Sequence, residues 1–129
     1  MLALLNSNCD VICLLDDDPS VLKAVTRLLS SAGWQVKQFS DPNEFLSYAK
    51  IRRPPVAVID IWMPLMNGLE VQSRLREQSP STRVIILTGK DDPLVRSAAL
   101  NAGASAFFDK PFDDEKLLTA IRLALAAAT

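Results

Sequence analysis

The sequence of 129 residues contains no histidine. This absence excludes Ser-His-Asp and Cys-His catalysis, HExxH zinc sites and a phosphohistidine within the chain. Cysteine is scarce as well, because Cys9 and Cys13 are the only two, four residues apart in a segment that we interpret as a strand. In a strand their Cα atoms would lie about 13 Å apart, too far for a disulfide. We therefore interpret both as small packing residues.

An excess of charge is also missing, since 14 Lys and Arg against 15 Asp and Glu give a net charge of -1. A nucleic-acid-binding surface usually needs a basic excess, so we expect no direct nucleic-acid binding by this segment. The longest apolar run, residues 123–128, is far shorter than the roughly 20 residues that span a bilayer. Residues 1–5 lack the positive flank and apolar core of a signal peptide. We predict a cytoplasmic protein with no membrane contact.

The length and composition indicate one folded domain over residues 1–129, with 49% hydrophobic and 22% charged residues. Short apolar runs alternate with helical patterns, which is typical of an α/β protein with a parallel sheet. We predict strands at 11–15, 35–39, 56–59, 84–87 and 106–108. The alternation of polar and apolar residues in the second predicts an edge strand. The sequence leaves open whether the domain is a fragment of a longer regulator.

Helix start signals follow these strands. An aspartate precedes a proline at 18–19, 41–42 and 92–93, and Asn67 with Glu70 resembles a capping box. We predict helices at 19–32, 42–50, 67–78, 93–102 and from about 113 onward. Five βα units with right-handed crossovers predict a doubly wound, flavodoxin-like sheet in the order 2-1-3-4-5. Its ligand crevice is expected at the carboxyl ends of strands 1 and 3.

Polar side chains gather at the predicted carboxyl ends of the strands. They are Asp16, Asp17 and Asp18 after the first strand, Asp60 after the third, Thr88 after the fourth and Lys110 after the fifth. In a parallel sheet these ends share one edge, so we expect these side chains to be neighbours. With Asp18 used as a helix cap, three carboxylates and one ammonium leave a charge of -2, which a divalent cation would neutralise. Oxygen ligands favour Mg²⁺, which completes its shell with phosphate oxygens, so the cluster predicts phosphoryl chemistry.

Each of these residues alone also has an ordinary structural explanation. Asp18 caps a helix, Thr88 ends a strand before a glycine, and Lys110 is a surface lysine before a proline. Lys110 nevertheless lies between Phe108 and Phe112, which favours a buried stem with its amine directed into the site. The combination, rather than any single residue, carries the functional interpretation.

Four segments resemble the motifs of the response-regulator receiver domain (CheY-like). They are LDDDPS at 15–20, IDIWMPLMNG at 59–68, LTG at 87–89 and AGASAFFDKPF at 102–112. Together, in this order and spacing, they cover nearly the whole chain. The Thr88-Gly89, Pro93 and Lys110-Pro-Phe pattern is most similar to the receivers of FixJ/NarL-type transcription regulators.

The resemblance implies a phosphoaccepting signalling switch of a two-component phosphorelay. Asp60 would be the nucleophile, and its donor would be the phosphohistidine of a sensor histidine kinase or phosphotransfer protein. Asp17 would bind Mg²⁺ directly and Asp16 mostly through water, while Trp62 would offer its backbone carbonyl. Trp62 is large where receivers often have a smaller or basic residue. Its ring would either limit water access and slow dephosphorylation, or merely cover the loop.

The resemblance also implies how the signal leaves the site. Thr88 would hydrogen-bond one phosphoryl oxygen and Lys110 would pair with another. Phe107 occupies the aromatic switch position, although Phe108 beside it leaves open which ring moves. The predicted fourth helix, fifth strand and fifth helix would form the output face.

This output face could also support phosphorylation-dependent homodimers. Leu94, Val95 and Ala98 are the candidates for such a contact, although their pattern fits core residues better. The sequence leaves open whether a DNA-binding domain follows Thr129.

Three other interpretations compete with a phosphoaccepting receiver. A haloacid-dehalogenase-like, Mg-dependent phosphatase also uses an aspartate after strand 1, but it looks for Asp-x-Asp followed by Gly-Thr and has no role for Asp60. A flavodoxin-like nucleotide or flavin carrier needs a hydroxyl- or glycine-rich phosphate loop where this chain has three aspartates. A degenerate receiver that binds partners without phosphate would lack residues that are present here.

Overall fold

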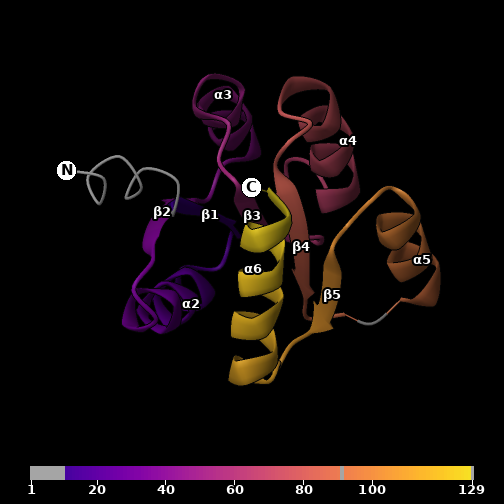
Figure 1. Ribbon diagram of the computed structural model, residues 1–129. Coiled ribbons are helices and arrows are strands. Elements are labelled where there is room, and N and C mark those ends of the chain that lie inside the picture. The colour runs from indigo at the N-terminus through magenta and orange to yellow at the C-terminus, as the bar shows by residue number, and fades with distance from the viewer. Residues whose placement is uncertain (1–10, 91, 129) are drawn as a thin grey trace.

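The computed structural model describes residues 11–90 and 92–128 (Figure 1). Cys9 and the N-terminal segment 1–5, on which two of the sequence predictions depend, lie outside these residues. Within the described ranges, no helix combines the length and apolar character needed to cross a bilayer.

One sheet of five parallel strands forms the centre of the molecule, in the order β2-β1-β3-β4-β5. The strands are β1 (Val11–Leu15), β2 (Gln35–Phe39), β3 (Val56–Asp60), β4 (Arg83–Thr88) and β5 (Ala106–Asp109). The predicted strand order is therefore confirmed. Every residue of β3 is buried, whereas β2 is mostly exposed, as expected of a central and an edge strand.

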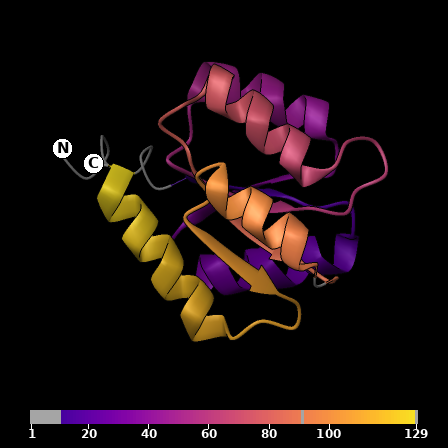
Figure 2. The ribbon, with the colours of Figure 1, turned by 90° about the vertical axis from the view of Figure 1, so that its right-hand side faces the viewer.

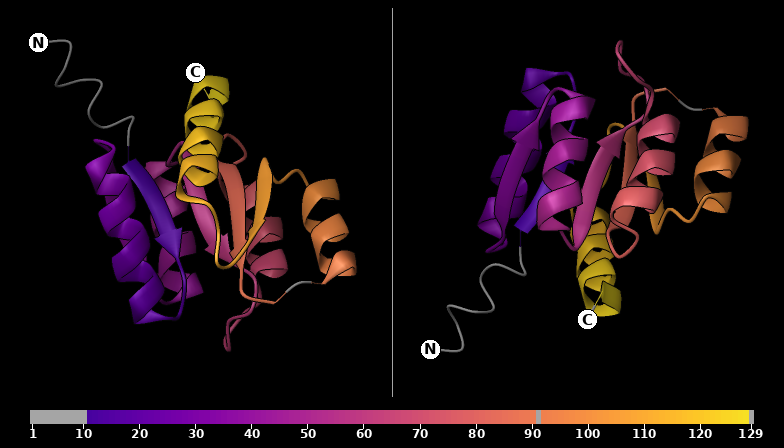
Figure 3. Two further views of the ribbon diagram at one scale, coloured as in Figure 1. Left: turned by 90° about the horizontal axis from the view of Figure 1, so that it is seen from below. Right: turned by 90° about the horizontal axis from the view of Figure 1, so that it is seen from above.

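Helices cover both faces of this sheet, which gives three layers. The helices α2 (Pro19–Ser31) and α6 (Asp114–Ala128) lie on one face (Figures 1 and 3). The helices α3 (Pro42–Arg52), α4 (Gly68–Gln78) and α5 (Pro93–Asn101) lie on the other. Figure 2 shows α3 and α4 side by side on their face, with α5 next to β5. This is the predicted doubly wound arrangement.

The predicted helix caps are present. Asp18, Asp41 and Asp92 each accept a hydrogen bond from a backbone N–H of the following first turn, at 2.9, 2.8 and 3.0 Å. Asn67 accepts one from the Glu70 N–H at 3.0 Å. The Glu70 carboxylate instead pairs with an arginine one turn further on, so only half of the capping box forms. These local contacts explain why the helices begin where the sequence predicted.

Several boundary predictions need correction. Helix α3 continues to Arg52 instead of ending at residue 50, and it stops because Arg53 adopts a left-handed C-cap conformation with φ 48°. The strands β3 and β4 are each longer at the carboxyl end, so Asp60 and Thr88 are the last residues of their strands rather than the first of the loops. Both side chains therefore start from hydrogen-bonded strand backbone.

The expectation that Leu94 and Ala98 are core residues is wrong. Leu94 is 82% exposed, Ala98 is exposed and Val95 is half-buried. By contrast, Cys13 is fully buried in β1, as a packing residue should be, and burial raises the pKa of its thiol to about 12. The core consists of one apolar cluster on each face of the sheet, and α5 contributes only Ala99 to them as a fully buried residue.

Candidate functional site

The three expected carboxylates meet at one edge of the sheet. Asp16 follows β1 and Asp60 ends the neighbouring strand β3, and one carboxylate oxygen from each of Asp16, Asp17 and Asp60 lies within 4.8 Å of the others. Asp16 and Asp60 are buried, at 2% and 5% exposure, whereas Asp17 is exposed. Asp18 caps α2, because its carboxylate accepts a hydrogen bond from the Ser20 backbone N–H at 2.9 Å. The sequence prediction of this cluster is confirmed in its geometry.

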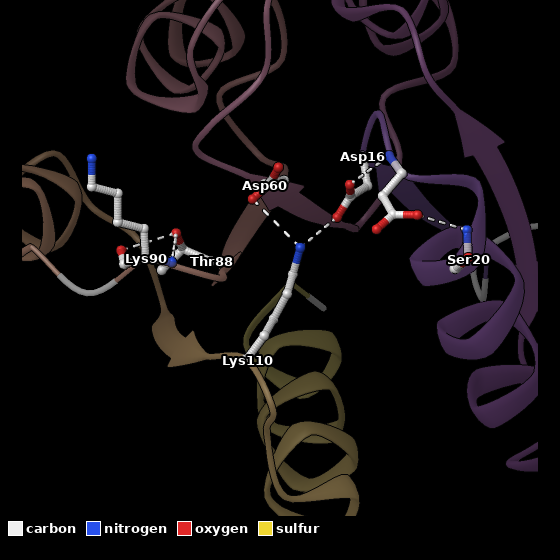
Figure 4. A network of polar contacts seen from close by, with 7 residues as sticks. Asp16, Ser20, Asp60, Thr88, Lys90 and Lys110 are labelled. Carbon is white, nitrogen blue, oxygen red and sulfur yellow. Dashed lines mark hydrogen bonds and ion pairs between the residues drawn. The ribbon is translucent and has the colours of Figure 1, made fainter.

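Lys110 brings the one ammonium group into the cluster. Its Nζ lies 2.8 Å from Asp16 Oδ2 and 3.6 Å from Asp60 Oδ1, and the side chain points between the two acids (Figure 4). Its backbone N–H donates to the Thr88 carbonyl at 2.6 Å, which continues the contact of β5 with β4 beyond the strand. The following Lys110–Pro111 peptide is cis. Phe112 is among the apolar residues packed against the core, in keeping with the expected buried stem of Lys110.

The electrostatics of the site centre on Asp60. The pKa of this carboxyl is raised from 3.8 to about 6. Burial is the largest cause and the negative charges of Asp16 and Asp17 act in the same direction, while Lys110 and a hydrogen bond from the Trp62 backbone lower the pKa. One ammonium thus does not compensate three carboxylates. The uncompensated negative charge explains why the arrangement suits a bound cation.

The acids differ in how far their oxygens are already used. Asp16 Oδ1 accepts from the Asp18 backbone N–H at 2.9 Å, and Asp16 Oδ2 accepts from Lys110. Among the described residues Asp17 has neither a hydrogen bond nor an ion pair. Its exposed carboxylate is therefore free to bind a metal ion, and the donor set of hard oxygens fits Mg²⁺. The residues present fit the cation that the sequence predicted.

Thr88 ends β4 and is fully buried. Its hydroxyl lies 3.3 Å from both the backbone carbonyl and the backbone N–H of Lys90, so it is engaged with the loop that follows β4 (Figure 4). Asp60 pairs with Leu87 in the sheet register, which puts Thr88 one residue beyond it on the neighbouring strand. Thr88 therefore lies at the same sheet edge as Asp60, with its hydroxyl directed toward Lys90.

Trp62 and Lys90 lie across the mouth of the site. Trp62 Nε1 donates to the Lys90 carbonyl at 3.3 Å, and the Lys90 ammonium lies 4.9 Å from the centre of the indole ring. Both residues line a cavity of about 430 Å³ together with Gly89, Lys110 and the acids Asp16, Asp17, Asp18 and Asp60. Sequence reasoning missed Lys90, because nothing in its sequence context distinguishes it from a surface lysine.

Gly68 is a second residue that sequence reasoning left without a role of its own. A Cβ at this position would lie 2.5 Å from the Asp60 carbonyl oxygen and 2.8 Å from Ile61 Cα, and the Gly68 N–H donates to the Ile61 carbonyl at 2.8 Å. The start of α4 thus packs directly against the backbone that carries Asp60. The available signal was a glycine at the first helical position, immediately after the capping Asn67.

Phe107 faces the core on the α5 side of the sheet, with 6% exposure. The guanidinium of Arg96 lies 5.1 Å from its ring centre and also 3.8 Å from Asp109. Phe108 is half-buried and packs on the opposite face. Of the two rings, Phe107 is the one on the α5 side of the sheet.

Comparison with known proteins gives one family. The chain matches the model of the response regulator receiver domain over residues 12–122. It is 39% identical over 124 residues to the response regulator protein TodT of Pseudomonas putida F1, covering 96% of this chain and 55% of TodT. It is 38% identical over 111 residues to the response regulator MprA of Mycobacterium leprae, covering 86% of this chain and 49% of MprA. The chain thus spans about half the length of these relatives.

Solved structures show the same fold. A CheY-like receiver domain protein from Methanospirillum hungatei has a TM-score of 0.87 at 28% identity, over 92% of this chain and 95% of that one. The beryllofluoride-activated NtrC4 receiver domain dimer has a TM-score of 0.88 at 28% identity, over 93% and 99%. The comparisons give no support to the phosphatase alternative.

Proposed function

Because this chain belongs to the response regulator receiver domain family of two-component signalling, we propose that Asp60 is its phosphoacceptor. The donor would be a phosphohistidine on a sensor histidine kinase or phosphotransfer protein, since the chain has no histidine of its own. The observation that carries the proposal is the buried Asp60 carboxylate beside Asp16, Asp17 and the Lys110 ammonium at one sheet edge.

In the proposed reaction, an Asp60 carboxylate oxygen attacks phosphorus in line with the leaving group. A P–O bond forms as the P–N bond of the donor breaks, and the departing imidazole keeps the bonding electron pair. Lys110, already 3.6 Å from Asp60 Oδ1, would pair with one phosphoryl oxygen. Thr88 would turn its hydroxyl from Lys90 toward another. Hydrolysis of the resulting acyl phosphate by water would reset the switch slowly.

Asp17, Asp16, Asp60 and the Trp62 backbone carbonyl are the proposed holders of Mg²⁺. The free carboxylate of Asp17 favours direct binding, whereas both oxygens of Asp16 already accept hydrogen bonds, which favours contact through water. The ion would supply positive charge beside the phosphoryl oxygens. Lys110 alone cannot do this, because it already neutralises Asp16 at 2.8 Å.

The proposed output is a shift of the face formed by α5, β5 and α6. Rotation of Thr88 would release Lys90, and Phe107 with its neighbour Arg96 would respond on the α5 side. The exposed Leu94 and Ala98 would be available for a phosphorylation-dependent homodimer. One relative bears the name probable transcriptional regulatory protein TcrX, from Mycobacterium tuberculosis, and the matched region covers 49% of its length. We propose that residues 1–129 act as one receiver domain in the cytoplasm, and that any DNA binding resides elsewhere.

The test is incubation with a small phosphodonor and Mg²⁺, followed by intact-mass measurement. We expect one phosphoryl adduct, stable in acid and labile in base, that is lost in Asp60→Asn. Asp18→Asn is the matched control. It makes the same chemical change at another residue that lines the cavity, and asparagine can still cap α2. An adduct that persists in Asp60→Asn, or disappears in Asp18→Asn alone, would contradict the proposal. Rapid multiple turnover of a phosphate ester would instead favour the phosphatase.

A further inference from the structure

Helix α5 is attached to the rest of the fold mainly through its last turn. Ala99 is its one fully buried residue, whereas α2, α3 and α4 each bury three or four. Leu94 near its start is 82% exposed and Leu100 is 43% exposed. A helix that buries so little apolar surface gains little packing energy along its length. Its position must therefore depend on specific contacts.

Two side chains of α4 supply such contacts, and both reach the carboxyl end of α5. Gln72 Nε2 donates to the Ala99 carbonyl at 2.9 Å, and Arg76, one turn along α4, donates from Nη1 to the Ala102 carbonyl at 3.0 Å. The Ala102 carbonyl lies at the end of the helix, where carbonyls lack partners within the helix, and Arg76 satisfies it. The Ala99 carbonyl accepts from Gln72 in addition to the backbone N–H of Ala104 at 3.0 Å, so Gln72 adds a contact between helices to an oxygen that is already bonded. The buried residue of α5 and its tethers thus meet at the same turn.

Burying Gln72 at this turn costs stability. The side chain is 2% exposed, and its Oε1 has no hydrogen-bond partner among the described residues. The amide orientation is fixed, because the Ala99 carbonyl can only accept and the nitrogen must face it. A buried amide with one group unsatisfied costs more than an apolar side chain of the same shape. Stability alone therefore does not account for a glutamine here, whereas positioning of α5 does.

The opposite end of α5 follows the loop that contacts the site. In that loop the Lys90 carbonyl accepts from Trp62, and the Lys90 backbone also bonds the Thr88 hydroxyl. In the first half of the helix, Arg96 lies over the Phe107 ring and 3.8 Å from Asp109, and the half-buried Val95 packs against the core cluster that contains Phe107. One end of α5 is thus tethered away from Asp60, and the other adjoins the residues that would respond to phosphorylation.

We infer that Gln72, with Arg76, is the pivot of α5. By pinning the Ala99 turn to α4, it makes a displacement of the loop after Thr88 tilt the helix instead of shifting it as a whole. Gln72 is thus a positioning residue that acts through the Ala99 carbonyl. The inference rests on the proposed function, because it describes how a change at Asp60 and Thr88 would move the output face.

Hydrogen exchange of the intact chain, with and without Mg²⁺ and beryllium fluoride, tests the pivot. In the wild type we expect beryllium fluoride to change exchange in the first half of α5, at residues 93–97, and to leave the amides of residues 102–104 protected. In Gln72→Met the amides of 102–104 should exchange about five- to tenfold faster, as expected for one lost hydrogen bond. The beryllium fluoride response should then spread over the whole helix.

Gln78→Met is the matched control, because it makes the same change at the half-buried end of the same helix, where the structure gives the side chain no hydrogen bond. It should behave as the wild type. If Gln72→Met does not fold, Arg76→Met, which changes an exposed side chain, serves in its place. It must speed the hydrogen exchange of the residue 102 amide, by a smaller factor than that expected for Gln72→Met. Unchanged protection and an unchanged response in Gln72→Met would overturn the pivot. A wild type without any response would instead count against the proposed function.

Discussion

The raised pKa of Asp60 predicts that this residue lowers the stability of the metal-free protein at neutral pH. The carboxyl has a pKa of about 6 in the folded protein against an ordinary value of 3.8, so the folded state holds a proton more tightly than the unfolded state. The contribution of Asp60 to stability is therefore complete below about pH 4 and is lost as the pH rises through about 6. Asp60→Asn removes the charge and with it this loss.

The magnitude follows from the difference between 3.8 and about 6, which corresponds to about 3 kcal/mol in total at about 1.4 kcal/mol for each pH unit. Between pH 4.5 and 7.5, where most of this difference develops, the stability of Asp60→Asn relative to wild type should increase by about 2 kcal/mol. Groups remote from Asp60 titrate equally in both proteins, so their contributions cancel in this comparison.

Urea unfolding of both proteins in a chelator at several pH values provides the measurement. Asp114→Asn, on the exposed first turn of α6, is a control that should follow the pH dependence of the wild type. A difference between Asp60→Asn and wild type that stays constant from pH 4.5 to 7.5 would refute the reasoning. So would an Asp60→Asn protein that becomes relatively less stable as the pH rises.

Three further predictions concern residues around Asp60. Gly68→Ala should lower the free energy of unfolding by about 1–3 kcal/mol, since its Cβ would overlap the Asp60 carbonyl; a loss of a few tenths in chemical denaturation would contradict this. Trp62→Ala should shorten the lifetime of the phosphoryl group, because the indole and Lys90 cover the cavity; identical decay of the adduct would show that the ring merely covers the loop. Lys110→Met should raise the pKa of Asp60 above about 6, and a carboxyl NMR titration that gives the same or a lower value would disprove it.

The features that sequence reasoning predicted well depend on local chemistry and on topology. Asp18, Asp41 and Asp92 cap helices through N–H groups only two residues away, so their effect can be read from neighbouring letters. The cluster of Asp16, Asp17 and Asp60 required one additional rule, that parallel strands end at a common edge. Given the strand order, remote acids had to become neighbours.

The features that sequence reasoning missed depend on packing between segments that are distant in sequence. Lys90 meets Trp62 across 28 residues, and Gly68 approaches the Asp60 backbone because of the path of the loop before α4. The sequence favours a core position for Leu94, although this residue is 82% exposed, because helical periodicity shows an apolar face but not whether anything covers it. Such contacts depend on three-dimensional detail that no periodicity or spacing encodes.

The main chain of Thr88 is held against β5, by pairing with Asp109 and by the hydrogen bond from the Lys110 N–H to the Thr88 carbonyl. Its first response to a new acceptor can only be rotation about χ1, an event on the picosecond-to-nanosecond scale in the absence of other barriers. Reorientation of an entire helix takes microseconds to milliseconds. The hydroxyl would thus change its orientation many times during each movement of the helix. The slow, collective motion of α5 therefore sets the rate of this switch, and relaxation-dispersion NMR on the α5 amides would measure that rate.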